Sequence, residues 1–286
     1  MSSGADFLLH GTQGAAVTAR GVRIRDLTPQ DCAAARLTMV SRLCRAGEAT
    51  PDGGTPFVDE AVVPCGEWRS PTEAEASSLL ARPDAPSDND LLVVPLPHLA
   101  ELLSARIELR RCADLSFAPD AIRACVDDLG PFCKSLEGLV CQGAWPGPGG
   151  LRNVTHRPDV RSPKRIGLHV DDWDRRPLID RAGGRRRLAA NLGLRPRYLV
   201  FLQTPVSVLA ADGKLFERPF ETLSAPELVG SYLMEHLSVP AARVRIDPGE
   251  AYIVNGEDIV HDGASDTPGT PDLSLHFMGH FGAPGS

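Results

Sequence analysis

The chain has 286 residues, of which 42% are hydrophobic, and a formal net charge of −7. A chain of this length can bury a large core, and we expect a single domain over residues 1–286. The acidic balance argues against a general nucleic-acid binder. The basic residues from Arg175 to Arg187 form a local run, which we interpret as a solvated loop or a lip that attracts an anionic substrate.

The seven cysteines all lie in the first half of the chain, and none falls in a Cys-x-x-Cys pair. An odd number without paired spacing disfavours a disulfide framework and favours a reducing compartment. Residues 1–6 lack the basic and then apolar run of a signal peptide, and no stretch approaches the roughly 18 apolar residues of a membrane helix. We therefore expect a cytoplasmic protein without a membrane partner.

Residues 1–145 are predicted to be a mainly helical support region. Apolar residues recur on one stripe over 29–45 after Thr28, which can cap a helix. Ser70-Pro71-Thr72-Glu73 opens a second capped helix that runs to about residue 82, and further helices are predicted over 98–111 and 119–136. Residues 91–96 read as a strand between them. We expect the helices to form a layer against one face of a β-sheet.

Residues 150–281 are predicted to be mainly β, after a flexible break at residues 145–150. Apolar or alternating segments predict strands over 151–155, 164–169, 197–202, 251–256, 259–261 and 273–281. A Ser-Ala-Pro-Glu start predicts a helical insert near 224–237. The fold class that follows is α+β, with a distorted jelly-roll core of the cupin type, also called a double-stranded β-helix.

Two short segments about ninety residues apart carry the candidate chemistry. His169 and Asp171 are two residues apart, so on an extended strand their side chains leave the same face and can bind one ion. His261, in Asp-Ile-Val-His-Asp-Gly, offers a second imidazole from a later strand. Two histidines and one carboxylate that leave coordination positions open are associated with non-haem Fe(II) oxygenases. A closed structural zinc site normally has four protein ligands instead.

This pattern resembles the Fe(II)/2-oxoglutarate-dependent oxygenases, whose His-x-Asp…His triad matches His169, Asp171 and His261. The resemblance covers roughly residues 150–281. It implies that these three residues are the catalytic metal ligands, that Fe(II) and 2-oxoglutarate are the cofactors, and that dioxygen is consumed. Related halogenases replace the carboxylate by a small residue, so Asp171 favours hydroxylation, desaturation or cyclisation.

The chain departs from the family at the distal carboxylate of 2-oxoglutarate. Many relatives place an arginine ten to fifteen residues after the second histidine, but here no Lys or Arg follows Arg245. Arg197, at the start of an apolar strand, is the first candidate for this role, followed by Arg165 and Lys214. Other possibilities are weaker contacts from His276 or Ser274, or an enzyme that uses no 2-oxoglutarate. Asn153, on a strand expected to lie beside the metal, is a further co-substrate candidate.

We therefore predict a dioxygenase that acts on a small molecule, such as an amino acid or a natural-product intermediate. A 2-oxoglutarate-independent iron oxidase is the alternative within enzymes. A cupin-like module with a non-catalytic metal is the alternative outside enzymes.

Overall fold

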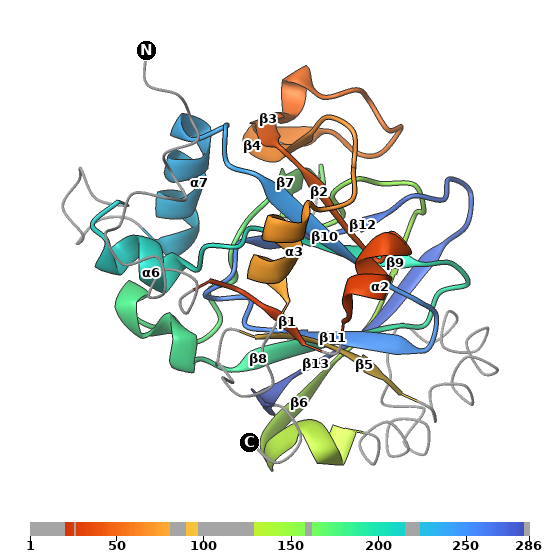
Figure 1. Cartoon of the computed structure of the whole chain (residues 1–286), viewed down its shortest axis with the longest axis vertical. Helices are drawn as coiled ribbons and strands as arrows, with labels where there is room; N and C mark the ends of the chain where they lie inside the picture. Colours follow the sequence, from red (N-terminus) through yellow and green to blue (C-terminus); the bar gives the residue numbers. More distant parts are fainter. Residues whose placement is uncertain are drawn as a thin grey trace.

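The computed structural model describes residues 21–25, 27–80, 90–96, 129–157, 162–214 and 224–282. The strands of these residues form three sheets (Figure 1). The six-stranded sheet has, in order, β1 (Ile24–Arg25), β5 (Leu91–Pro95), β11 (Glu250–Val254), β8 (Arg186–Asn191), β13 (Asp272–Phe281) and β6 (Cys133–Gly147). The four-stranded sheet has β12 (His261–Ser265), β9 (Arg197–Phe201), β10 (Ala241–Ile246) and β2 (Leu37–Val40). The smallest sheet has β3 (Arg42–Arg45), β4 (Phe57–Cys65) and β7 (Arg165–Gly167).

The two larger sheets pack face to face across a shared apolar core. Val93 and Val254 from the six-stranded sheet share one buried cluster with Leu199, Phe201 and Val244 from the four-stranded sheet. Because side chains alternate along a strand, the neighbours of these residues point to the outer faces. On β13, for example, Leu275 and Phe277 belong to a different cluster, on the outer side of the six-stranded sheet.

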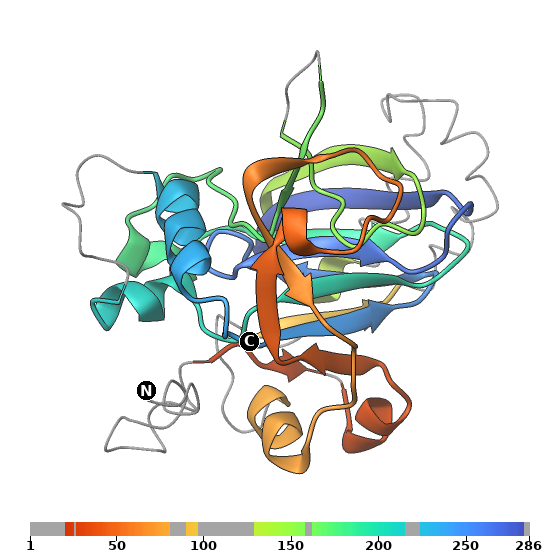
Figure 2. The ribbon, with the colours of Figure 1, turned by 90° about the horizontal axis from the view of Figure 1, so that it is seen from above.

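The few described helices lie around the sheets. Helices α6 (Val206–Ala211) and α7 (Ala225–Glu235) contribute to the apolar cluster on the outer face of the four-stranded sheet. They lie together on one side in both views, apart from α2 (Pro29–Ala33) and α3 (Glu73–Leu79) (Figures 1 and 2). Thr72 and Ser224 cap α3 and α7 in reciprocal capping boxes. Ser224 agrees with the predicted Ser-Ala-Pro-Glu start, whereas the cap of α3 is Thr72 and not the Ser70 before Pro71.

Among the described residues of the first half, the prediction over 29–45 is wrong, and the mainly helical region as a whole stays a prediction. Only Pro29–Ala33 of the helix predicted over 29–45 is helical, and the rest of that segment forms β2 and β3. The helix predicted over 98–111 and most of the one over 119–136 lie outside the described residues, and residues 133–136 belong to β6. The predicted break at 145–150 is also wrong in part, because β6 continues to Gly147.

In the second half of the chain, the structure agrees better with the elements predicted from the sequence. Strands β9, β11 and β13 and helix α7 match their predicted ranges to within about two residues. Residues 151–155 form no named strand, although Val154 N–H donates to Gly263 O at 3.0 Å. The mixed α+β class with curled sheets is confirmed (Figure 2), while the jelly-roll connection and the single-domain division stay predictions.

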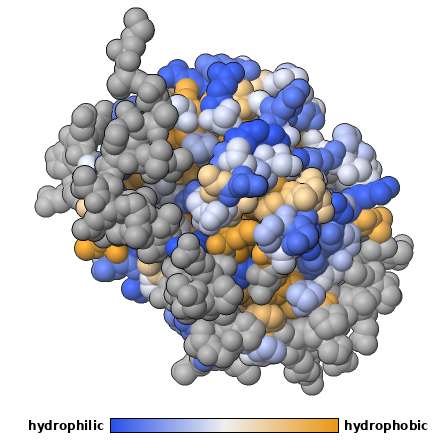
Figure 3. Space-filling view, in the orientation of Figure 1, coloured by the Kyte–Doolittle hydropathy of each residue, from blue (hydrophilic) through white to orange (hydrophobic). Residues whose placement is uncertain are grey.

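The described surface is mixed in character. Hydrophilic side chains interrupt the hydrophobic ones over the face shown in Figure 3. Among the described helices, none has the length and apolar character needed to cross a membrane.

Candidate metal centre

Backbone pairing brings the two histidines of the motif side by side. His169 N–H donates to His261 O at 3.1 Å, and His261 N–H donates to His169 O at 2.8 Å. In such a hydrogen-bonded antiparallel pair the two side chains leave the same face. The ring centroids are accordingly 5.0 Å apart. A segment next to β7 is thus joined to the first residue of β12.

In each histidine, a hydrogen bond from one ring nitrogen fixes the direction in which the second ring nitrogen points. Nδ1 of His169 hydrogen-bonds Gly167 O at 2.8 Å, and Nδ1 of His261 hydrogen-bonds Ile259 O at 2.9 Å. In both cases the acceptor is the carbonyl two residues earlier in the chain. Such a bond sets the tautomer with Nδ1 protonated, which leaves Nε2 as a lone-pair donor.

Asp171 completes the group. One ligand atom from each of His169, Asp171 and His261 lies within 4.8 Å of the others. Asp171 Oδ2 and His261 Nε2 are 3.8 Å apart. Both atoms are buried, and no hydrogen-bond partner for either is found in the described part of the chain. Buried polar atoms are nearly always satisfied, so a cation between these atoms fits the site.

The electrostatics keep the three groups ready to bind a cation. Burial alone raises the pKa of Asp171, but Arg187, the two histidines and a hydrogen bond from Trp173 outweigh it, and the pKa lies below its usual value. Burial is also the main reason that the pKa of His261 falls to about 4. At neutral pH the site therefore holds a carboxylate and a neutral His261 imidazole, the forms that ligate metals.

Gly256 and Arg181 hold the loop that carries Asp171. Asp171 N–H donates to Gly256 O at 2.8 Å, and a Cβ on Gly256 would lie only 2.3 Å from Asp171 Oδ2. The buried Arg181 donates through Nη1 to Asp171 O and to Glu257 O, each at 3.0 Å, and pairs with the Asp172 carboxylate. One guanidinium thereby joins the segment after His169 to the segment before His261.

Arg197, the first candidate for the co-substrate, lies between the same two sheets. It shares a face of β9 with Leu199 and Phe201, and Phe201 is the register partner of His261. Four residues separate Arg197 from Phe201, which places its Cα about 13 Å along the strand from the metal end. Its side chain is buried, and its only described partner is Asp272 Oδ2 at 3.8 Å. Nε and Nη1 have no hydrogen-bond partner among the described residues.

His276 lies between Arg197 and the metal end. Ala189 of β8 pairs with His276 of β13 on one side and with Tyr252 of β11 on the other. The three side chains therefore lie side by side on the inner face of the six-stranded sheet. Burial, reinforced by the cations of Arg187 and Arg197, holds the pKa of His276 well below its usual value. His276 Nε2 hydrogen-bonds Ser274 Oγ at 2.8 Å. These contacts place a polar pair on the inner face of β13, close enough to Arg187 and Arg197 to feel both charges.

The other co-substrate candidates point elsewhere. Asn153 Nδ2 donates to Asp262 Oδ2 at 2.8 Å, and Asp262 is on the opposite face of β12 from His261. Arg165 is buried in a two-pronged ion pair with Asp52, with both N–O distances 2.7 Å. Lys214 follows α6 and lies 3.7 Å from Asp212. These three side chains are engaged in contacts away from the triad.

Sequence reasoning missed Arg187. The solvated-loop interpretation of the basic run is wrong for the buried Arg181 and for Arg186 and Arg187, which lie on β8 with little exposure. Arg187 Nη2 is 3.0 Å from Asp171 Oδ2. The only available signal was an arginine one residue before the apolar segment 188–190, and strand partners cannot be read from that signal.

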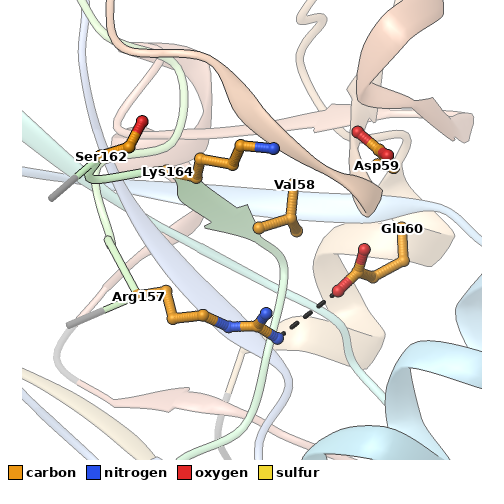
Figure 4. Close-up of a pocket in the computed structure, with 6 residues that line it drawn as sticks. All are labelled: Val58, Asp59, Glu60, Arg157, Ser162 and Lys164. Atoms are coloured by element: carbon orange, nitrogen blue, oxygen red, sulfur yellow. Dashed lines mark hydrogen bonds and ion pairs between the residues drawn. The ribbon is translucent and has the colours of Figure 1, made fainter. Parts of the chain in front are cut away.

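A surface pocket lies apart from the triad residues. It is lined by side chains of β4 and of the segment before β7, namely Val58, Asp59, Glu60, Arg157, Ser162 and Lys164 (Figure 4). Arg157 reaches across it to Glu60 at 3.4 Å. No triad residue contributes to its wall, so we assign it no part in the chemistry.

Comparisons with known proteins find only distant similarity. No protein-family profile and no curated protein sequence matches the chain. Apo HygX from Streptomyces hygroscopicus matches at 13% identity and TM-score 0.34, over 68% of this chain and 81% of HygX. The Kdo hydroxylase KdoO, a non-heme Fe(II) alphaketoglutarate dependent dioxygenase, matches at 16% and 0.37, over 67% and 79%. The non-heme alpha ketoglutarate dependent epimerase SnoN matches at 14% and 0.36, over 68% and 78%. TM-scores this low assign neither a fold nor an activity to this chain.

Proposed function

We propose that this chain is a mononuclear non-haem Fe(II)- and 2-oxoglutarate-dependent dioxygenase acting on a small molecule. The observation that carries the proposal is the triad geometry. Both histidines hydrogen-bond through Nδ1, which leaves Nε2 free to ligate, and the Nε2 of His261 and the Oδ2 of Asp171 are buried without a hydrogen-bond partner among the described residues, although Oδ2 forms an ion pair with Arg187 at 3.0 Å. Two imidazoles and one carboxylate suit Fe(II) and leave coordination positions for other ligands.

Different residues would bind the metal and the co-substrate. His169, Asp171 and His261 would hold the metal, and Arg197 would pair with the distal carboxylate of 2-oxoglutarate. The buried Arg197 has a long ion pair with Asp272 at 3.8 Å, and its Nε and Nη1 have no acceptor among the described residues, so a bound carboxylate would satisfy N–H groups that are costly to bury without partners. His276 and Ser274 would line the space between these two positions.

When bound, Fe(II) and 2-oxoglutarate would supply oxidation of a substrate C–H bond by dioxygen, with 2-oxoglutarate leaving as succinate and carbon dioxide. The Asp171 carboxylate fills the position that related halogenases leave open, which supports hydroxylation, desaturation or cyclisation. The burial of His261 strengthens the charged contacts on the inner side of the site, while His169 and Asp171 are partly exposed. A free amino acid or a natural-product intermediate is the proposed substrate class.

The test is anaerobic reconstitution with Fe(II), followed by addition of oxygen and 2-oxoglutarate and measurement of succinate. We expect succinate from the wild type, and neither stoichiometric iron nor succinate from His169→Ala or His261→Ala. His280→Ala is the matched control, because His280 is an exposed histidine on β13 outside the triad.

Each alternative has its own outcome. Iron binding and oxygen consumption without succinate would indicate a 2-oxoglutarate-independent oxidase. Iron binding without oxygen consumption under any added keto acid would indicate a non-catalytic module. Full iron occupancy in His261→Ala would overturn the ligand assignment itself.

A further inference from the structure

Arg187 contacts a metal-ligand candidate directly, and the proposed function gives it no role. It lies on β8 between Val254 of β11 and Met278 of β13. Leu188 and Ala190 face the outer cluster, so Arg187 shares the inner face with Ala189. Its side chain is 13% exposed. The guanidinium is therefore directed into the space between the two sheets, at the metal end.

The guanidinium and the metal position share one carboxylate oxygen. Arg187 Nη2 is 3.0 Å from Asp171 Oδ2, and the same oxygen is 3.8 Å from His261 Nε2. A cation ligated by Oδ2 and His261 would therefore lie close to the positive charge of Arg187. Like charges at such short range in a buried site repel strongly. Metal binding thus weakens the hold of Arg187 on Asp171.

The same guanidinium has unused capacity for an anion. Nε of Arg187 is buried, and the described residues offer it no hydrogen-bond acceptor. An arginine fork binds a carboxylate best through two parallel N–H donors. A carboxylate placed between the metal and Arg187 would satisfy both cations at once. Trp173, whose ring lies 5.8 Å from the Arg187 guanidinium carbon, borders the same space and is 56% exposed.

We infer that Arg187 couples metal binding to the binding of a carboxylate at the metal. Without metal it neutralises Asp171, and with metal bound it becomes the partner of that carboxylate. The inference rests on the proposed function for the identity of the metal site. The carboxylate has two possible sources, namely the metal-bound end of 2-oxoglutarate and the acidic group of the primary substrate.

The coupling predicts that one substitution, Arg187→Met, changes the affinities for metal and for carboxylate in opposite directions. Arg187→Met removes the competing cation, so the metal-free protein should bind Ni(II) several-fold more tightly than wild type. The same variant lacks the carboxylate partner, so the Ni(II)-loaded protein should bind oxalate about tenfold more weakly, the loss of one charge-assisted contact. Oxalate is chosen because it offers carboxylates at the metal and cannot reach the Arg197 position. Both constants can be measured by isothermal titration calorimetry.

Controls separate charge from packing. Arg187→Lys keeps the charge and loses the fork, so Ni(II) affinity should stay near wild type while oxalate affinity falls. Arg245→Met is the matched arginine control, because Arg245 is 38% exposed on β10 and pairs with Asp247 at 2.7 Å. It should change neither constant. Thermal melting of each variant establishes that it is folded.

The two carboxylate sources are told apart by a second titration. Weaker binding of oxalate and of 2-oxoglutarate to Ni(II)-loaded Arg187→Met identifies the co-substrate carboxylate. Unchanged affinity for both, together with weaker binding of acetate to the Ni(II)- and 2-oxoglutarate-saturated variant, identifies a substrate carboxylate.

Two failures remain distinguishable. If Arg187→Met weakens Ni(II) and anion binding together, or alters neither, the coupling is wrong although the metal site stands. If His261→Ala binds Ni(II) with the same affinity as the wild type, the metal site of the proposed function is wrong.

Discussion

Gly256→Ala tests the ligand geometry without touching a ligand. Gly256 is buried, and the Cβ of an alanine would lie 2.3 Å from Asp171 Oδ2 and 2.9 Å from His261 Cε1. An ordinary carbon–oxygen contact needs roughly 3.3 Å, so the carboxylate must retreat by about 1 Å. Metal–ligand distances tolerate only about 0.2 Å. The added methyl group therefore acts directly on the metal-facing oxygen.

The expected effect is a loss of metal affinity in a folded protein. Perturbing a group that positions a ligand typically costs about 10–100-fold in metal affinity, which corresponds to about 1.4–2.8 kcal/mol of binding free energy. Isothermal titration with Ni(II) measures the constant, and circular dichroism checks the fold. Gly230→Ala on α7 is the matched control, since an added Cβ there meets nothing within 4 Å. It should leave Ni(II) affinity unchanged and stabilise the helix by up to about 1 kcal/mol. Wild-type Ni(II) affinity in Gly256→Ala would refute the placement of Asp171 Oδ2 at the metal.

Three further outcomes are expected. Arg197→Ala should raise the apparent constant for 2-oxoglutarate about tenfold or more, as expected for losing about 1.4 kcal/mol of charge-assisted binding, and should leave Ni(II) affinity intact; wild-type kinetics would show that another group binds the distal carboxylate. Asp171→Gly should abolish hydroxylation-type turnover, and wild-type enzyme supplied with chloride should give no chlorinated product by mass spectrometry; a chlorinated major product would contradict the role given to Asp171. The pKa of His261 falls from its usual 6.5 to about 4 mainly through burial, so this histidine takes up its proton at higher pH in the unfolded chain than in the folded protein. The metal-free protein should therefore lose up to about 3 kcal/mol of stability between about pH 6.5 and pH 4, as measured by urea denaturation. A His261→Gln variant with the same pH dependence would exclude His261 as the cause.

The sequence by itself determined the local parts of the site. The two-residue spacing of His169 and Asp171 and the alternation along β13 can each be read within one short segment, although the structure places Asp171 in the loop after β7 and not on a strand. The capping boxes at Thr72 and Ser224 are similarly local, because each N-cap N–H donates to the carboxylate of a glutamate three residues later. Where the cause of a structure lies within a few residues, the pattern predicted it.

Long-range pairing decided the rest. Residues 37–40 of the wrongly predicted helix are all buried, so the strand has no alternating polar face, and its pairing with β10 joins residues 205 apart, such as Thr38 and Arg243. A continuous apolar run is ambiguous between helix and strand until its neighbours are known. The same limit applies to the site. Arg187 and Arg197 are both arginines at strand starts in the sequence, and only the packing of the two sheets places one against the Asp171 carboxylate and the other buried between the sheets with free donors. Gly256 likewise reads only as the last residue of the strand predicted over 251–256, and its close approach to Asp171 Oδ2 exists only once the segments around residues 171 and 256 are brought together.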